Sequence, residues 1–92
     1  MNYSKYLVEY FGTLVFLFVI IATGNPWMIG LTLAILIALG GAISGGNFNP
    51  AVSVMMYYIG NLNLTDMISY IVLQILGGLS AVELYRMMTI MG

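Results

Sequence analysis

The 92-residue chain is 62% hydrophobic and 5% charged, with two Lys or Arg, three Asp or Glu, no His and no Cys. Since a soluble domain of this size needs more polar surface, this composition indicates a membrane protein. It also excludes disulfides and leaves no His, Cys or paired carboxylates for a metal site or for acid–base catalysis, so we expect no enzyme, metal or cofactor. A net charge of −1 without a basic run argues against nucleic-acid binding.

The first long apolar run covers residues 6–23 and is interrupted at Glu9. Its length approaches the ~20 residues that a helix needs to cross a bilayer. The Asn-Pro pair at residues 25–26 should end this helix, because proline lacks a donor and disfavours helix in the residue before it. The alternative is a cleaved signal peptide with Lys5 as its charged region. Glu9 argues against it, because it interrupts the transition from charged to apolar residues.

Two further apolar runs, residues 27–43 and 67–88, predict a second and a third spanning helix. Thr65-Asp66 is expected to start the third, with the threonine as its cap and the aspartate at the positive end of its dipole. Gly77 and Ala81, four residues apart, predict a close contact with a neighbouring helix.

Between these two runs, residues 44–59 form a polar, glycine-rich passage followed by a short apolar segment. Residues 50–59 would be about 15 Å long as a helix, half of a hydrocarbon core of about 30 Å. Asn49 is a favoured N-cap and Pro50 a favoured first helical residue. We therefore predict a re-entrant loop and half-helix whose positive N-terminal end points at the bilayer midplane. The alternative is a surface loop followed by an interfacial helix.

The sequence SGGNFNPAVS at residues 44–53 resembles the Ser-Gly-x-x-x-Asn-Pro-Ala signature of the major intrinsic proteins, the aquaporin and aquaglyceroporin family. Residues 9–13 are similar to the Glu-Phe-x-Gly-Thr of the family's first helix, and residues 70–78 to the Tyr-x-x-x-Gln-x-x-Gly of its third. The resemblance covers nearly the whole chain in order. It implies an all-α, multi-pass integral membrane protein with three transmembrane helices and one re-entrant half-helix.

The departure from the family concerns length. Family members have six spanning helices and two half-helices in inverted repeats, whereas residues 1–92 resemble one repeat. A complete pore would then need two copies in opposite orientations, an antiparallel homodimer in the lipid bilayer. Lys5 near one end and Arg86 near the other give almost no charge bias, as dual topology requires. Family members commonly form tetramers of pores, which implies eight such chains.

The resemblance also assigns roles in a channel for water and small neutral solutes such as glycerol. The amide of the motif asparagine would hold a passing molecule, and the half-helix dipoles would oppose cations. Carbonyl groups of the preceding loop would form a ladder of acceptors. The alternative function is a non-conducting fragment or assembly element of a full-length channel. The pore residues expected on this basis are Asn49, Pro50, Ala51, Gly45, Gly46 and Asn47.

Two polar residues in the long runs are expected to support the loop. Glu9 is expensive in lipid unless it has partners, and the family's equivalent glutamate binds backbone N–H groups of the re-entrant loop. The alternative for Glu9 is a charge at the membrane interface. Gln74 has a similar choice between joining two helices and supporting the loop.

The narrow filter of the family uses the positions 20, 12 and 3 residues before the motif asparagine and 3 after it. None of the four corresponding residues is aromatic, His or Arg, and Val52 stands where the family's filter arginine is usual. We therefore predict a wider and less selective pore than that of a strict water channel. The filter-equivalent residues are Ile29, Ile37, Gly46 and Val52.

Overall fold

The computed structural model describes residues 2–91. It contains four helices in the order α1 (Ser4–Thr23), α2 (Pro26–Ser44), α3 (Pro50–Tyr58) and α4 (Leu64–Met91). The helices α1, α2 and α4 are each long and apolar enough to cross a membrane. The predicted fold class, an all-α membrane protein with three long apolar helices and one short one, is confirmed. The ends of the predicted domain, residues 1 and 92, lie outside the described residues.

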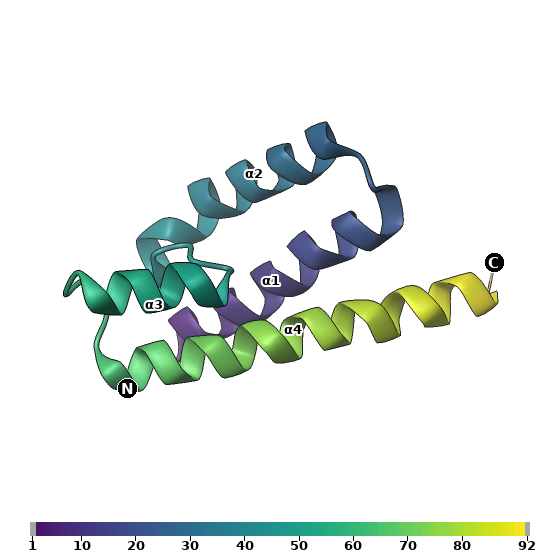
Figure 1. Cartoon of the computed structure of the whole chain (residues 1–92). Helices are drawn as coiled ribbons and strands as arrows, with labels where there is room; N and C mark the ends of the chain where they lie inside the picture. The colour runs from purple at the N-terminus through teal and green to yellow at the C-terminus, as the bar shows by residue number, and fades with distance from the viewer. Residues whose placement is uncertain (1, 92) are drawn as a thin grey trace.

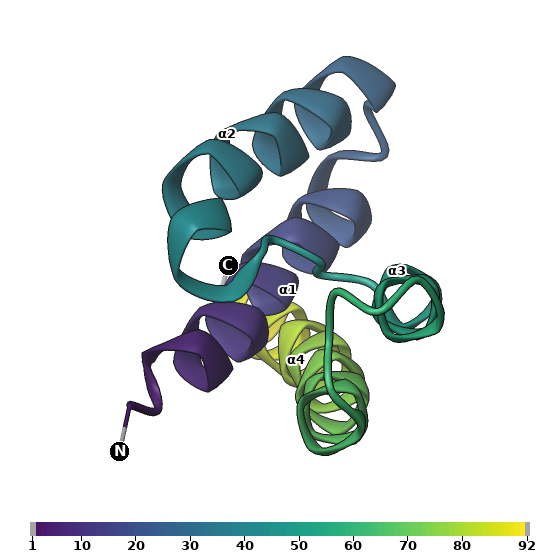
Figure 2. The same ribbon diagram turned by 90° about the vertical axis from the view of Figure 1, so that its left-hand side faces the viewer.

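Of the three long helices, α1 is the central one and packs against both α2 and α4. Figure 1 shows that α3 begins opposite the middle of α4 and runs back toward the end where α4 starts. The view along the bundle in Figure 2 places α2 and α4 on different sides of α1, with α3 beside α4. The short helix therefore accompanies only one half of the bundle.

The turn between α1 and α2 lies at the predicted Asn-Pro break. Gly24 ends α1 in a left-handed conformation with φ of 58°, which glycine adopts without strain. The side chain of Asn25 caps α2 by accepting hydrogen bonds from the N–H groups of Trp27 and Met28. Pro26 is the first helical residue, where its missing donor costs nothing.

The predicted start of α4 is wrong in detail. The helix begins at Leu64, and its cap is Asn63, whose Oδ1 accepts the N–H of Asp66 at 2.7 Å. Thr65 lies inside the first turn and is not the cap. Asparagine is as good a cap as threonine or better, so the start moves to the earlier residue.

Burial in this bundle is the reverse of that in a soluble protein. The fully buried side chains include several polar ones from α1, α3 and α4, among them Glu9, Ser53 and Gln74. Large apolar side chains on every helix are exposed instead, for example Leu31, Leu39 and Leu79. This pattern fits lipid as the surrounding solvent, because the hydrocarbon core solvates apolar side chains and not polar ones.

Candidate pore centre

The residues of the Asn-Pro-Ala motif form the start of α3. Asn49 is its N-cap, and the side-chain Oδ1 accepts the N–H of Ala51 at 2.8 Å. The carbonyl group of Asn49 accepts the N–H of Ser53 at 3.0 Å. Pro50 is the first helical residue, as the sequence predicts. Within residues 2–91, the side-chain Nδ2 of Asn49 donates no hydrogen bond, so this amide is free for a ligand.

The loop that precedes α3 is held by one buried carboxylate. Glu9 is 0% exposed, so the alternative that it is an interfacial charge is wrong. Its Oε2 accepts the Ser44 hydroxyl at 2.7 Å and the N–H of Asn47 at 3.1 Å. Its Oε1 accepts the N–H of Phe48 at 2.8 Å and the side-chain Nε2 of Gln74 at 2.8 Å. Four donors from α2, the loop and α4 therefore converge on one side chain of α1 and compensate its burial.

Ser53 links α3 to the same network. Its hydroxyl oxygen accepts from Nε2 of Gln74 at 2.8 Å and from Nδ2 of Asn47 at 3.0 Å. Gln74 therefore joins two helices and also reaches the loop through Glu9, so the two roles considered for it occur together. The consequence is that the depth of α3 in the bundle is fixed by hydrogen bonds rather than by apolar packing alone.

Phe48 fixes the loop on its other side. The ring is 2% exposed and lies against Gly12 of α1 and Gly40 of α2, and a methyl group at Gly12 would overlap with it. The residue has φ of 54°, in the left-handed region that is costly for a side chain with a Cβ. The hydrogen bond from its N–H to Glu9 and the burial of its ring offset this cost.

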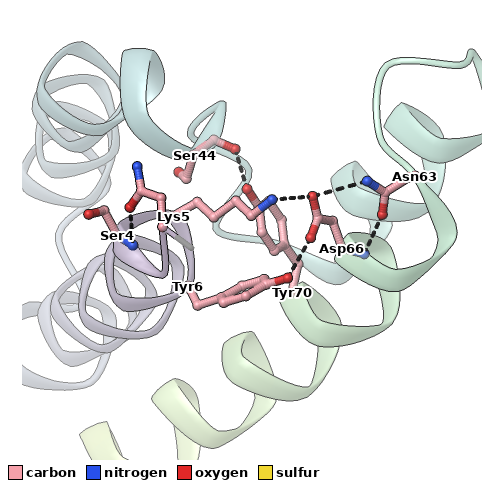
Figure 3. Close-up of polar contacts among 8 residues, drawn as sticks. Ser4, Lys5, Tyr6, Ser44, Asn63, Asp66 and Tyr70 are labelled. Atoms are coloured by element: carbon pink, nitrogen blue, oxygen red, sulfur yellow. Dashed lines mark hydrogen bonds and ion pairs between the residues drawn. The ribbon is translucent and has the colours of Figure 1, made fainter.

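A second polar cluster lies at the end of the bundle where α1 and α4 begin. Figure 3 shows Lys5 and Tyr6 of α1 pointing at Asp66 of α4, at Nζ–Oδ2 and hydroxyl–Oδ1 distances of 2.7 and 2.6 Å. In the same view Tyr70 donates its hydroxyl to the carbonyl oxygen of Ser44 at 2.7 Å. This bond ties α4 to the end of α2, where the loop begins.

The structure brings most of the predicted pore residues to one pocket of about 340 Å³. One wall is the loop, whose carbonyl groups at Gly45, Gly46 and Asn47 accept no hydrogen bond within residues 2–91. The opposite side is apolar and includes Phe16 and Leu33. The predicted residues that line this pocket are Ile37, Gly45, Gly46, Asn47, Asn49 and Val52.

The other predicted residues lie elsewhere. Ile29 is near the start of α2 and is not part of the pocket lining. Pro50 lines a different pocket, and Ala51 is exposed. Glu9 and Gln74 lie behind the loop and α3, where they contact backbone and side-chain groups rather than the pocket.

Sequence reasoning missed three residues that shape this site: Ser53, Tyr70 and Phe48. Ser53 could have been found, because it is the one serine or threonine on the short apolar helix and lies one turn after Asn49. Tyr70 is the tyrosine of the Tyr-x-x-x-Gln-x-x-Gly pattern at residues 70–78, but the pattern assigns it no partner, and Phe48 carries no such signal. Their partners are 26 and 39 residues away along the chain, so only the fold reveals them.

Three membrane-spanning helices around a buried polar loop and half-helix define an integral, multi-pass membrane protein. Comparison with known proteins gives its family. The model of the major intrinsic protein family matches residues 1–92, and the chain belongs to this family.

Curated relatives agree with this assignment. The chain is 40% identical over 86 residues to the glycerol uptake facilitator protein-like 6 of Lactiplantibacillus plantarum, covering 84% of the chain and 40% of that protein. It is 36% identical over 93 residues to aquaporin Z of Brucella melitensis, covering 85% of the chain and 41% of that protein. The chain thus spans less than half the length of these relatives. No solved structure gives a significant match.

Proposed function

We propose that the chain is one repeat of a membrane channel for water and small neutral solutes such as glycerol, and that two oppositely oriented copies complete the pore. The observation that carries this proposal is the pocket of about 340 Å³ beside the re-entrant loop. It combines an apolar wall with carbonyl groups and an Asn49 amide that have no hydrogen-bond partner among residues 2–91. The chain belongs to a family whose relatives are named as aquaporins and as a glycerol uptake facilitator. This membership supports passive transport as the function, rather than catalysis.

The pocket suits a molecule that has hydroxyl groups on one side and carbon atoms on the other. Carbonyl groups of Gly45, Gly46 and Asn47 accept hydrogen bonds from the solute, and the amide of Asn49 donates one. The positive end of the α3 dipole lies at the same place and opposes cations. The pore is thus proposed to select by charge and hydrogen bonding.

A less selective filter follows from the residues around the pocket. Ile37, Gly46 and Val52 add no charge and no aromatic ring, and Ile29 is remote from this pocket. Without a fixed positive charge, exclusion of cations rests on the two half-helix dipoles and on the cost of dehydrating an ion. We therefore propose passage of both water and glycerol.

The two-copy pore is supported by the length of α3 and by the charges. Nine helical residues reach about 13.5 Å, less than half of a hydrocarbon core of about 30 Å. The two basic residues lie at opposite ends of the bundle, Lys5 at the start of α1 and Arg86 near the end of α4, so neither orientation is favoured.

The test of the channel is stopped-flow swelling of proteoliposomes that contain the purified chain, with water and with glycerol. We expect flux above the lipid background for both solutes. Asn49→Asp should lower glycerol flux and admit cations, because it replaces a donor in the pocket with an anion. The matched control is Asn61→Asp, in the exposed turn before α4, which should change neither. Wild-type flux at the lipid background would reject the channel.

The competing proposal is a non-conducting assembly element of a longer relative, which the short alignment with full-length proteins favours. Orientation distinguishes the two. Thiols introduced in tags at the two termini should both be labelled from either side of the membrane if the topology is dual. A fixed orientation, with each terminus labelled from one side only, would favour the assembly element.

A further inference from the structure

A pocket of about 390 Å³ lies between the first turn of α1 and the second and third turns of α4. Tyr6 belongs both to this pocket and to the polar cluster that Figure 3 shows at the end of the bundle where α1 and α4 begin. The pocket shares no residue with the one beside the re-entrant loop. We call it the outer groove. The residues that line it are Tyr6, Ile68, Ser69, Val72 and Leu73.

The outer groove is polar at one end and apolar along the rest. Its polar end adjoins Lys5 and Asp66, near the starts of α1 and α4, so this end lies in the headgroup layer of the membrane. That layer is about 5–8 Å deep on each side, since a bilayer of about 40–45 Å has a hydrocarbon core of about 30 Å. Val72 lies two turns after Leu64, the first residue of α4, and so about 12 Å further along the helix. The groove therefore extends from the headgroup layer into the hydrocarbon.

The polar end of the groove offers hydrogen-bond donors. The ammonium group of Lys5 has three N–H groups, and within residues 2–91 its one partner is Asp66, at an Nζ–Oδ2 distance of 2.7 Å. The Lys5 side chain is 35% exposed, and its Nζ lies 5.3 Å from the centre of the Tyr6 ring, which is a wall of the groove. The Ser69 hydroxyl adds a second polar group inside the groove. Donors are therefore available at the mouth for an acceptor that comes from outside the chain.

The apolar part of the groove faces the lipid. Ile68 and Val72 are 52% and 50% exposed, and α3 packs against α4 through Gln74, which is buried. The groove thus opens away from the short helix, on a side where the bilayer itself supplies the neighbours. A phospholipid carries an acceptor, its phosphate, directly above apolar chains, in the order and direction that the groove requires. A helix of another protein suits the site less well, because its backbone acceptors are already paired.

The charge of the polar end limits what the headgroup must carry. Lys5 and Asp66 together have no net charge, so the site needs one phosphate as a hydrogen-bond acceptor and gains little from a second negative charge. Lipids with a zwitterionic and with an anionic headgroup should therefore bind alike. A lipid without phosphate should bind more weakly.

We infer that the outer groove binds one glycerophospholipid, with its phosphate on the ammonium group of Lys5 and an acyl chain along Ile68 and Val72. Because α1 and α4 both contribute to the groove, the bound lipid joins the starts of these two helices. This inference goes beyond the proposed channel and needs no second copy. Its tests measure lipid retention, so they stand whether or not the protein conducts.

Native mass spectrometry of the purified chain, released from detergent with added dioleoylphosphatidylcholine, measures the retained lipid. The chain has two basic residues, each in an ion pair, at 2.7 Å for Lys5 and 2.8 Å for Arg86, so Arg86→Met is the matched control for Lys5→Met. We expect Lys5→Met to lower retention by about fivefold, which corresponds to about 1 kcal/mol for one basic side chain at a lipid surface. Arg86→Met should leave retention unchanged, and Lys5→Arg should preserve it. Equal losses from Lys5→Met and Arg86→Met would overturn the site.

Lys5→Met also leaves Asp66 without its ion pair, so a second variant separates lipid binding from folding. Asp66→Asn keeps the ammonium group and gives the polar end a net positive charge. We expect this variant to retain dioleoylphosphatidylglycerol about fivefold better than dioleoylphosphatidylcholine, whereas the unmodified chain retains the two alike. An unchanged ratio of the two lipids in Asp66→Asn would overturn the placement of the phosphate at Lys5.

The apolar half is tested by filling the groove. Val72→Phe should lower retention by about fivefold, because the larger ring takes the place of acyl carbon atoms. Val54→Phe on α3 is the matched control, since Val54 is 48% exposed and lines none of the pockets described above. Equal retention in the two variants would overturn the path of the acyl chain.

The chemical source of the phosphate is tested with two further probes. Dioleoylglycerol, which lacks phosphate, should be retained about fivefold less than dioleoylphosphatidylcholine, and millimolar inorganic phosphate should not displace the phospholipid. Equal retention of dioleoylglycerol would overturn the role of the phosphate. Displacement by inorganic phosphate would overturn the lipid site in favour of a site for a free anion.

Discussion

The contact between α1 and α4 should be disrupted by a side chain at Gly77 but should tolerate one at the neighbouring Gly78. A Cβ atom at Gly77 would lie 2.7 Å from the carbonyl oxygen of Tyr10 and 3.2 Å from the backbone nitrogen of Leu14. Both obstacles are helical backbone, which cannot rotate away. A Cβ atom at Gly78 would also meet an atom at 2.7 Å, but this atom is the Cδ1 of Leu17, the end of a flexible side chain.

The size of the effect follows from these distances. In Gly77→Ala, α4 must move outward by about 0.7 Å to bring the Cβ to 3.4 Å, where ordinary contact begins. Such overpacking costs about 1–3 kcal/mol. The same movement stretches the 2.8 Å bond between Gln74 and Glu9, one turn away, and losing this bond to a charged group costs about 1.5–3 kcal/mol. At either position, the higher helix propensity of alanine compared with glycine stabilises the helix by about 1 kcal/mol.

We therefore expect Gly77→Ala to lower the free energy of unfolding by about 1.5–5 kcal/mol and Gly78→Ala to leave it unchanged or raise it by up to about 1 kcal/mol. Unfolding can be followed by titrating the protein in mild detergent with sodium dodecyl sulfate. The near-ultraviolet circular dichroism of the packed tyrosines reports the loss of tertiary contacts. Equal stability of the two variants would refute the reasoning, because it would mean that α1 and α4 do not approach as closely as the structure has them.

Two other predictions concern the end of the bundle where α4 begins and the orientation of the chain. Asn63→Ala should lower the free energy of unfolding by about 1 kcal/mol in the same titration, whereas Thr65→Ala should change it by less than about 0.5 kcal/mol, since only Asn63 caps the helix. A comparable loss from both would contradict the assignment of the cap. Asn61→Lys should drive the population toward one orientation and lower flux if the pore needs both, because Asn61 lies at the same end as Lys5. Adding Thr89→Lys at the opposite end should restore both orientations and the flux, and a lasting loss in this double variant would argue against dual topology.

The sequence predicted the fold class because hydropathy and helix length are local properties of the chain. Three long apolar runs became α1, α2 and α4, and the Asn-Pro pair at residues 49–50 marked the start of the short helix. The burial of Glu9 followed from its position inside an apolar run, where a charge needs partners. These features can be found without knowing which helices are neighbours.

The remaining features depend on contacts between distant parts of the chain. The pairing of Lys5 with Asp66 joins residues 61 apart, and hydropathy does not indicate it. In the sequence Phe48 is one apolar residue among many. Its packing between α1 and α2 depends on Gly12 and Gly40, which leave room for its ring. The start of α4 was misplaced because Asn63 and Thr65 are both acceptable caps, and the choice between them depends on how the preceding turn leaves α3.

The buried carboxylate of Glu9 has a consequence for the order in which the protein is made. Ser44, Phe48 and Gln74, which supply three of its four donors, follow it by 35, 39 and 65 residues. At a synthesis rate of about 5–20 residues per second, α1 emerges roughly 2–13 s before these partners exist. During this interval the carboxyl group must stay in contact with water or the insertion machinery, because inserting a charged side chain costs up to about 2.5–3.5 kcal/mol, the value at the centre of an isolated helix, and Glu9 lies in the first third of α1. The final depth of α1 in the membrane is therefore fixed only after α4, the last helix to be translated, has been made.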